Sequence, residues 1–99
     1  MENNNFLKGL KFGEKLKKDL RCILNQGRLD DKKGVLRIRK FTKDEEKDYY
    51  FNIFETCYEH EKNIKTYKIV DKITENTVFK GNKKDYEYFC VGVSQAIEI

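Results

Sequence analysis

Apolar side chains recur every three or four residues in the first quarter of the chain. The recurring positions are Phe12, Leu16, Leu20, Ile23 and Leu24. They fall on one arc at 100° per residue, which is typical of an amphipathic helix. Asn5 is a candidate N-cap, and Gly27 suits the position after the helix because glycine adopts a left-handed backbone at little cost. The pattern predicts a helix over residues 6–26.

Two glycines fall on the apolar side of this helix. Gly9 and Gly13 lie about one turn apart there, although glycine inside a helix costs about 1 kcal/mol relative to alanine. We expect them either where the backbone of a sheet approaches the helix closely or where the first turns of the helix break.

Beyond Gly27 the dominant period changes from 3.6 to 2, which indicates strands. The predicted strands cover residues 35–41, 49–58, 64–74, 77–80 and 89–99, with turns at 30–34, 42–48, 59–63, 75–76 and 81–84. The second of these strands is rich in Tyr and Phe, which favour strands. The last alternates strictly, with Phe89, Val91, Val93, Ile97 and Ile99 on one face.

The connections between these strands have the length of hairpin turns, and such connections imply antiparallel pairing. One face of the sheet would then pack on the helix. A chain of 99 residues usually forms one domain. The predicted fold is therefore α+β, a single compact domain over residues 1–99 with one N-terminal helix packed on a curled antiparallel sheet of four to five strands.

The three cysteines, Cys22, Cys57 and Cys90, form an odd set that does not suit a disulfide framework. No run of about 20 apolar residues is present, and residues 1–5 lack the layout of a secretion signal. The chain has no proline or tryptophan and is rich in Lys, Asn and Ile, which is typical of AT-rich bacterial and phage genomes. We expect the cytoplasm of a bacterial host cell, and no membrane partner.

Basic residues concentrate in the first half of the chain. Residues 1–43 carry 13 Lys and Arg against 5 acids, whereas residues 44–99 carry 8 lysines against 12 acids. This asymmetry indicates either an acidic partner for the first half or a solvated lysine-rich helix. Exposed tyrosines would suit protein interfaces or base stacking, unless a strongly curled sheet buries them. The predicted partner-binding residues are Lys11, Lys15, Lys18, Arg37, Arg39, Lys40, Tyr50 and Tyr58.

Few residues suggest catalysis. His60 is the only histidine and follows Cys57 by three residues, a spacing that points side chains to opposite faces of a strand. A zinc site needs three or four ligands. Glu55 is the carboxylate most embedded among apolar neighbours, and we interpret it as lying at the rim of the sheet. The glycines match no phosphate-binding fingerprint, so we expect no catalytic residues, no metal and no cofactor.

These patterns predict a small non-enzymatic binding protein that occupies a functional surface of a protein or ribonucleoprotein partner. Size and composition favour a phage or mobile-element inhibitor of a host defence system, of the anti-CRISPR-like kind. The alternative is a nucleic-acid-binding protein that contacts RNA or DNA directly with its basic helix and strand surface and its tyrosines. A third hypothesis is a small enzyme with a site at Glu55 or at Cys57 and His60.

Overall fold

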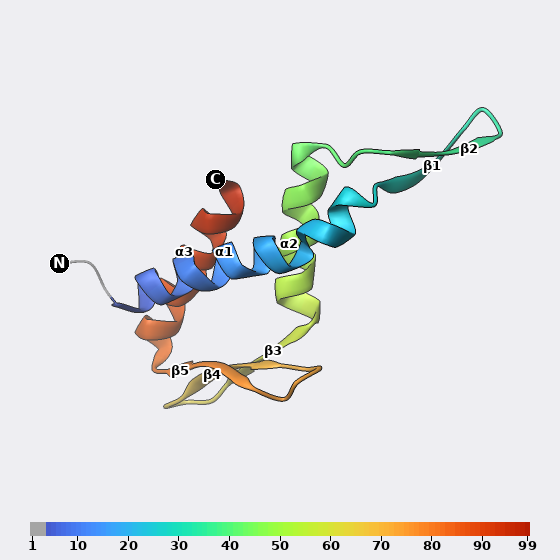
Figure 1. Cartoon of the computed structure of the whole chain (residues 1–99). Coiled ribbons are helices and arrows are strands. Elements are labelled where there is room, and N and C mark those ends of the chain that lie inside the picture. Colours follow the sequence, from blue (N-terminus) through green and yellow to red (C-terminus); the bar gives the residue numbers. More distant parts are fainter. Residues whose placement is uncertain (1–3) are drawn as a thin grey trace.

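The computed structural model describes residues 4–99, and over this range it contains three helices and two small antiparallel sheets (Figure 1). The helices are α1 (Asn4–Asn25), α2 (Lys43–Thr56) and α3 (Lys83–Glu98). The first sheet pairs β1 (Arg28–Lys32) with β2 (Val35–Arg39), and the second has the order β3 (Tyr58–Lys62), β4 (Tyr67–Asp71), β5 (Thr77–Gly81). The α+β class is confirmed. The predicted arrangement of one helix on a sheet of four to five strands is wrong.

Helix α1 confirms the predicted helix over residues 6–26, although it begins at Asn4, so Asn5 lies inside it. Gly27 follows with φ +85°, as expected. The backbone that approaches Gly9 and Gly13 belongs to α3 and not to a sheet. A Cβ at Gly13 would lie 2.6 Å from the Cβ of Ala96, and one at Gly9 would collide with the Phe89 carbonyl.

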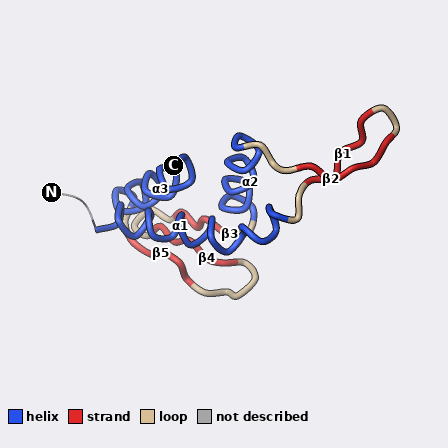
Figure 2. The backbone as a smooth tube through the Cα atoms, turned by 45° about the horizontal axis from the view of Figure 1, so that its top comes forward, coloured by secondary structure: helices blue, strands red, loops and turns tan. Residues whose placement is uncertain are grey.

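The core gathers side chains from all three helices and the three-stranded sheet. Its buried members are Leu16, Leu24, Tyr50, Phe54, Ile69, Phe79, Phe89, Val93 and Ile97. The rings of Phe79 and Phe89 stack with centroids 4.9 Å apart. Helices α2 and α3 both cross α1, and the β3–β4–β5 sheet spans between their lower ends (Figures 1 and 2). The helices and this sheet therefore form one body.

Helix α2 replaces the turn predicted at residues 42–48 and the strand predicted at 49–58, and both predictions are wrong. Thr42 caps the helix by accepting a hydrogen bond from the Glu45 backbone N–H, and the Glu45 side chain accepts one from the Thr42 backbone N–H. This reciprocal capping box fixes the start of a helix. Tyr50 and Phe54 are four residues apart and both face the core.

Helix α3 replaces the strand predicted at residues 89–99, which is also wrong. Asn82, expected in a turn, caps the helix by accepting a hydrogen bond from the backbone N–H of Asp85 at 2.8 Å. The buried residues follow the helical period: Phe89, Gly92, Val93, Ala96 and Ile97. Val91 and Ile99, which the strand needed on its buried face, are exposed.

The remaining strands match the sequence in part. The turn predicted at 59–63 is wrong because β3 occupies it, and the strand predicted at 64–74 shortens to β4. The hairpin predicted around 75–76 is present, with Glu75 at φ +63°, but its loop covers residues 72–76 and is longer than the predicted tight tip. Strand β5 covers the predicted return strand. The strand at 35–41 is confirmed over β2. Within residues 4–99 no helix has the length and apolar character needed to cross a membrane.

Candidate functional site

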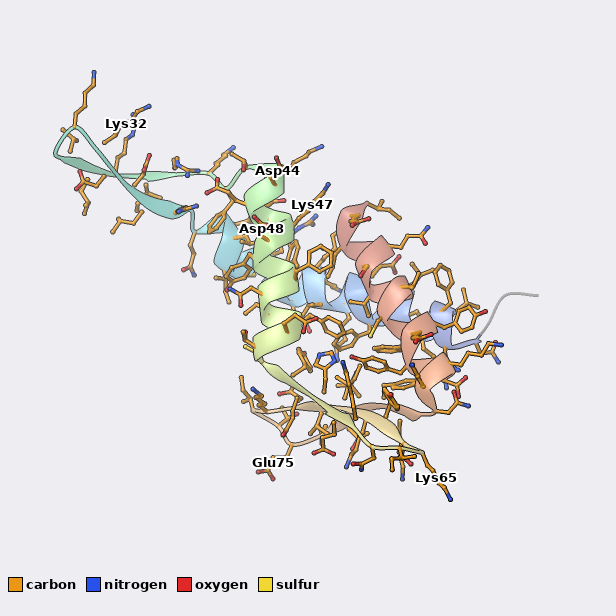
Figure 3. All side chains as sticks on the ribbon, turned by 180° about the vertical axis from the view of Figure 1, so that it is seen from behind. Lys32, Asp44, Lys47, Asp48, Lys65 and Glu75 are labelled. Carbon is orange, nitrogen blue, oxygen red and sulfur yellow. The ribbon has the colours of Figure 1, made fainter. Side chains whose placement is uncertain are left out.

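A two-stranded ribbon projects from the body, and we name residues 28–40 the β1–β2 arm. It leaves the C-terminal end of α1 and returns to the start of α2 (Figures 1 and 2). The molecule measures 53 × 28 × 19 Å, and the arm lies along its extended direction. Lys32 stands at the far end, away from Lys65 and Glu75 at the opposite end of the molecule (Figure 3). None of the residues of the arm is buried.

The register of the ribbon separates two faces. Leu29 pairs with Ile38 and Asp31 pairs with Leu36, so these four share one face. The three aliphatic side chains on that face are 63 to 69% exposed. The opposite face carries Arg28, Asp30, Lys32, Val35, Arg37 and Arg39. The β1–β2 arm is therefore amphipathic, with an apolar face and a basic face that are both open to solvent.

Ion pairs fix the base of the arm to the start of α2. Arg39 donates to Glu45 through both of its terminal nitrogens, at 2.7 and 3.0 Å, and its Nε lies 3.3 Å from Asp30 Oδ2. Arg28 donates to the same Glu45 carboxylate. The hydrogen bond from Arg39 holds the pKa of Glu45 well below its ordinary value, and the Thr42 backbone N–H lowers it further. One carboxylate thus caps α2 and pairs with both arginines.

The predicted partner-binding residues divide into three groups. Arg37 and Lys40 are exposed on the β1–β2 arm, whereas Arg39 is held in the Glu45 ion pairs. Lys11, Lys15 and Lys18 are exposed on α1.

The two predicted tyrosines pack with the core. Tyr50 is 7% exposed, and burial raises its pKa. Tyr58 is half-buried, with its ring 5.2 Å from Phe12 and 6.3 Å from Phe54. We therefore place neither tyrosine in the candidate contact surface.

Sequence reasoning missed β1 and with it the apolar face of the arm. Residues 28–32 were expected to be mostly turn, because Asp and Lys dominate them. A signal was present, because Leu36 and Ile38 alternate with Arg37 and Arg39 as in a strand. A strand needs a partner strand to form a ribbon, so this alternation called for a second strand nearby. The role of Glu45 was also missed, although Thr42 and Glu45 have the spacing of a capping box.

His60 has a structural environment. Its Nε2 donates to the Phe54 carbonyl at 3.1 Å, because a carbonyl only accepts, and its Nδ1 lies within hydrogen-bond distance of the Tyr86 hydroxyl, at 2.8 Å. Both ring nitrogens are thus engaged. Burial raises the pKa of the Tyr86 phenol and of the Cys90 thiol, which leaves that thiol protonated and weakly nucleophilic.

The other chemical candidates are dispersed. Glu55 is exposed on α2, and all three cysteines are free thiols. Among residues 4–99, no group of three or more His, Cys, Asp or Glu side chains is placed to hold a metal ion.

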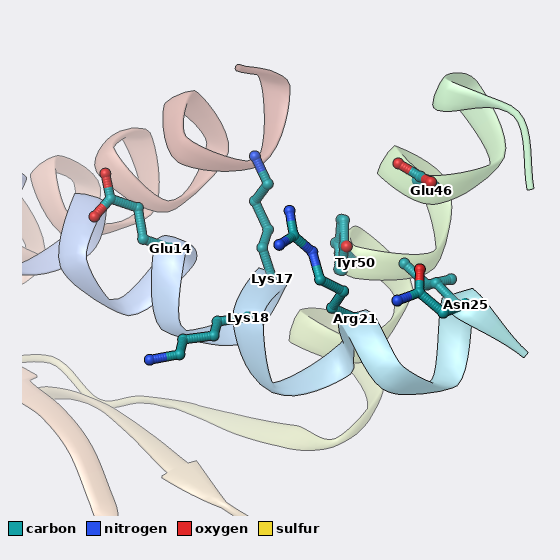
Figure 4. Close-up of a pocket in the computed structure, with 8 residues that line it drawn as sticks. Glu14, Lys17, Lys18, Arg21, Asn25, Glu46 and Tyr50 are labelled. Carbon is teal, nitrogen blue, oxygen red and sulfur yellow. The ribbon is translucent and has the colours of Figure 1, made fainter.

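A cleft of about 710 Å³ lies between α1 and α2. Figure 4 shows Lys17 and Arg21 pointing from α1 into the space beside Tyr50 and Glu46. The lining mixes cations with the acids Glu14 and Glu46, and Lys17 already donates to the Ala96 carbonyl at 3.0 Å. The cleft therefore lacks the convergent chemistry of a binding site, and the β1–β2 arm is the stronger candidate.

Comparisons of the chain with protein-family models, with curated proteins and with solved structures found no match.

Proposed function

We propose that this protein acts by binding, without catalysis, and that its β1–β2 arm occupies an acidic functional surface of a partner. The observation that carries the proposal is an amphipathic ribbon that projects from the body with its side chains open to solvent. An isolated two-stranded ribbon is marginally stable in water. An exposed cluster of aliphatic side chains rimmed by charges commonly marks a contact surface.

The base of the arm supports the same function. The ion pairs of Glu45 with Arg28 and Arg39 hold the ribbon in one direction relative to α2. A contact element fixed in advance loses less conformational entropy on binding than a flexible loop. The arm thus has the properties of a preorganised probe.

Within this class we propose an inhibitor that blocks a protein or ribonucleoprotein of a bacterial defence system, of the anti-CRISPR-like kind, in the cytoplasm of the host. Three features support this proposal: the small size of the chain, an amino-acid composition typical of AT-rich genomes, and the apolar face of the arm, which suits a groove on a partner. Direct binding of nucleic acid is the second candidate. The observation that favours it is the positive charge of the arm, whose residues 28–40 carry six Lys and Arg against two Asp.

An arm-less variant tests the proposal. Arg28 and Arg39 lie directly opposite each other, so Asn-Gly can replace residues 29–38 and close a tight turn between them. This variant keeps Arg28, Arg39 and Glu45. Its melting temperature should match the parent, because the arm contributes no buried residue. We expect it to lose the macromolecules that the parent retains from bacterial lysate after cross-linking.

A control that loses the same number of cations, three, guards against loss of nonspecific attraction. The triple variant Lys65→Ala, Lys72→Ala, Lys80→Ala removes three exposed lysines near the β3–β4–β5 sheet, and it should retain the same macromolecules as the parent. Unchanged retention by the arm-less variant would contradict the proposed function.

A further inference from the structure

Resting on the β1–β2 arm as the contact element of the proposed function, and developing its second candidate, we infer that the surface occupied by the arm is the major groove of double-stranded DNA. The first support is charge. Lys32, Lys33, Arg37 and Lys40 lie outside the ion pairs found among residues 4–99, while Arg28 and Arg39 are held by Glu45. Phosphate contacts by such cations release condensed counterions and supply affinity for a polyanion.

The shape of the arm matches that groove. Neighbouring strands lie about 4.8 Å apart, and the major groove of B-form DNA, about 12 Å wide, admits a two-stranded ribbon. Each strand of the arm has five residues, which is roughly 17 Å at about 3.3 Å per residue. Laid lengthwise in the groove, which is about 8.5 Å deep, the ribbon turns one of its faces toward the floor along this whole length.

The two faces of the ribbon have separate partners in this arrangement. Leu29, Leu36 and Ile38 lie toward the floor, where aliphatic side chains contact thymine methyl groups. Asp31 shares this face, and a carboxylate there accepts a hydrogen bond from the cytosine N4 amino group. The long side chains of Lys32 and Arg37 extend from the other face to the phosphates on the groove walls, since a ribbon of this width lies close to both walls. Both faces of the amphipathic ribbon therefore contact the DNA.

The acidic residues of α2 lie away from the tip of the arm. Glu45 sits at the base of the arm and is neutralised there by Arg28 and Arg39. The acids Asp44 and Asp48 lie on α2, away from Lys32 at the tip (Figure 3). Lys11, Lys15 and Lys18 line the exposed flank of α1, which leads into the arm. Positive charge therefore extends from α1 to the tip.

The same geometry discriminates between nucleic acids. A-form RNA duplexes have a deep and narrow major groove that side chains cannot read, so a ribbon enters it poorly. Single strands have no groove and are held by aromatic stacking, whereas the arm carries no aromatic residue within residues 28–40. The inference therefore predicts a preference for duplex DNA over both.

Fluorescence anisotropy with labelled probes tests this preference. The probes are a DNA duplex of about 20 base pairs, the RNA duplex of the same sequence and one DNA strand, titrated with full-length protein over a range of salt. We expect the tightest binding to duplex DNA. Binding to the RNA duplex or the single strand that equals binding to duplex DNA would overturn the groove assignment, as would no duplex binding at about 50 mM salt.

Two arm variants separate the roles of the faces. Lys32→Ala, Arg37→Ala, Lys40→Ala should weaken duplex binding about tenfold or more near 0.1 M salt and flatten the log–log salt dependence by about 0.9 per lost phosphate contact. Leu29→Ala, Leu36→Ala, Ile38→Ala should weaken binding at every salt concentration without changing that slope. The control is again Lys65→Ala, Lys72→Ala, Lys80→Ala, and an effect as large as that of the basic arm variant would overturn the inference.

The outcomes also separate this inference from the proposed function. Absence of DNA binding together with arm-dependent retention of a protein or ribonucleoprotein from lysate would overturn the DNA assignment and leave the arm as the contact element. Absence of both would overturn the two proposals. Circular dichroism of each variant, compared with the parent, establishes that the body remains folded.

Discussion

Two regions of the molecule are built in opposite ways. One is the contact between helices α1 and α3, and the other is the β1–β2 arm. Along α1 and α3, Gly9, Gly13 and Gly92 let two helix backbones approach until no room remains for a Cβ. In the arm, Leu36 and Ile38 are 65% and 69% exposed and touch no core. The helix contact depends on glycines, which allow two backbones to be buried against each other. The arm instead carries large apolar side chains that stay in solvent.

This difference separates stability from function within one short chain. Burial of apolar area is the main favourable term in folding, and the buried residues lie in the body. The arm supplies none of them, so its side chains are free to serve a contact. A substitution in one region should therefore change the free energy of unfolding, and the same substitution in the other should change binding.

Replacing leucine by alanine in each region gives the largest expected contrast. Leu16→Ala should lower the free energy of unfolding by about 2–5 kcal/mol, because Leu16 is 5% exposed. Leu36→Ala should change it by no more than about 0.5 kcal/mol, because that side chain is mostly in solvent. Urea unfolding followed by circular dichroism measures both. Equal losses would show that the arm takes part in the folding core.

Adding a small side chain at a glycine gives the next contrast. Gly92→Ala should cost about 1–3 kcal/mol, since its Cβ would collide with the Phe6 carbonyl and α1 must move. Gly34→Asn is the matched change in the arm. It has no atom within 4 Å of the new Cβ, and asparagine tolerates the positive φ there. Thermal melts compare the two, and a stable Gly92→Ala would refute the close approach.

Acid should weaken the ion pairs between the β1–β2 arm and α2 before it unfolds the body. The pKa of Glu45 is lowered by Arg39 from its ordinary value of 4.5. The folded state therefore gains from this carboxylate above about pH 4.5 and loses that gain as the pH falls toward the lowered pKa. NMR relaxation should show greater motion of the arm at about pH 3 than at about pH 7. In Glu45→Gln the arm should already be mobile at neutral pH, with no comparable acid-induced step.

The smallest expected effects come from metal and redox treatment. The three cysteines are free thiols, and they sit on α1, at the end of α2 and on α3. Neither EDTA nor a reductant should shift the melting temperature of the body or the binding curve of the arm. A marked fall with either reagent would mean that a ligand or cross-link joins these elements.

The sequence predicted α1, β2 and β5, because each has a single dominant local pattern. Residues 89–99 fit two local patterns. The same positions that alternate as a strand also place Phe89, Val93, Ala96 and Ile97 at helical spacing, and tertiary packing against Gly9 and Gly13 selects the helix. Residues 49–58 were assigned by their aromatic content, but strand propensity depends on context, and the capping residues Thr42 and Glu45 determine the helix.

Half of the candidate site was visible in the sequence. Arg37 and Lys40 were identified as contacts from charge and period, and both are exposed on the arm. The pairing of Arg39 with Glu45 was not visible, because it joins a strand to a helix that the sequence pattern had read as a turn. The apolar face could not be assigned either, since whether Leu36 and Ile38 are buried depends on what lies above them in three dimensions.

The projecting arm also changes how the molecule moves through solution. The Cα radius of gyration is 15.9 Å, whereas a compact domain of 100 residues has about 13 Å. Gel filtration separates by hydrodynamic size, so a monomer of 11.9 kDa should elute ahead of globular standards of its own mass. Its elution volume would then match that of a larger globular protein, whereas light scattering would give the mass of a single chain. Loss of the arm should delay elution by more than the lost mass alone accounts for.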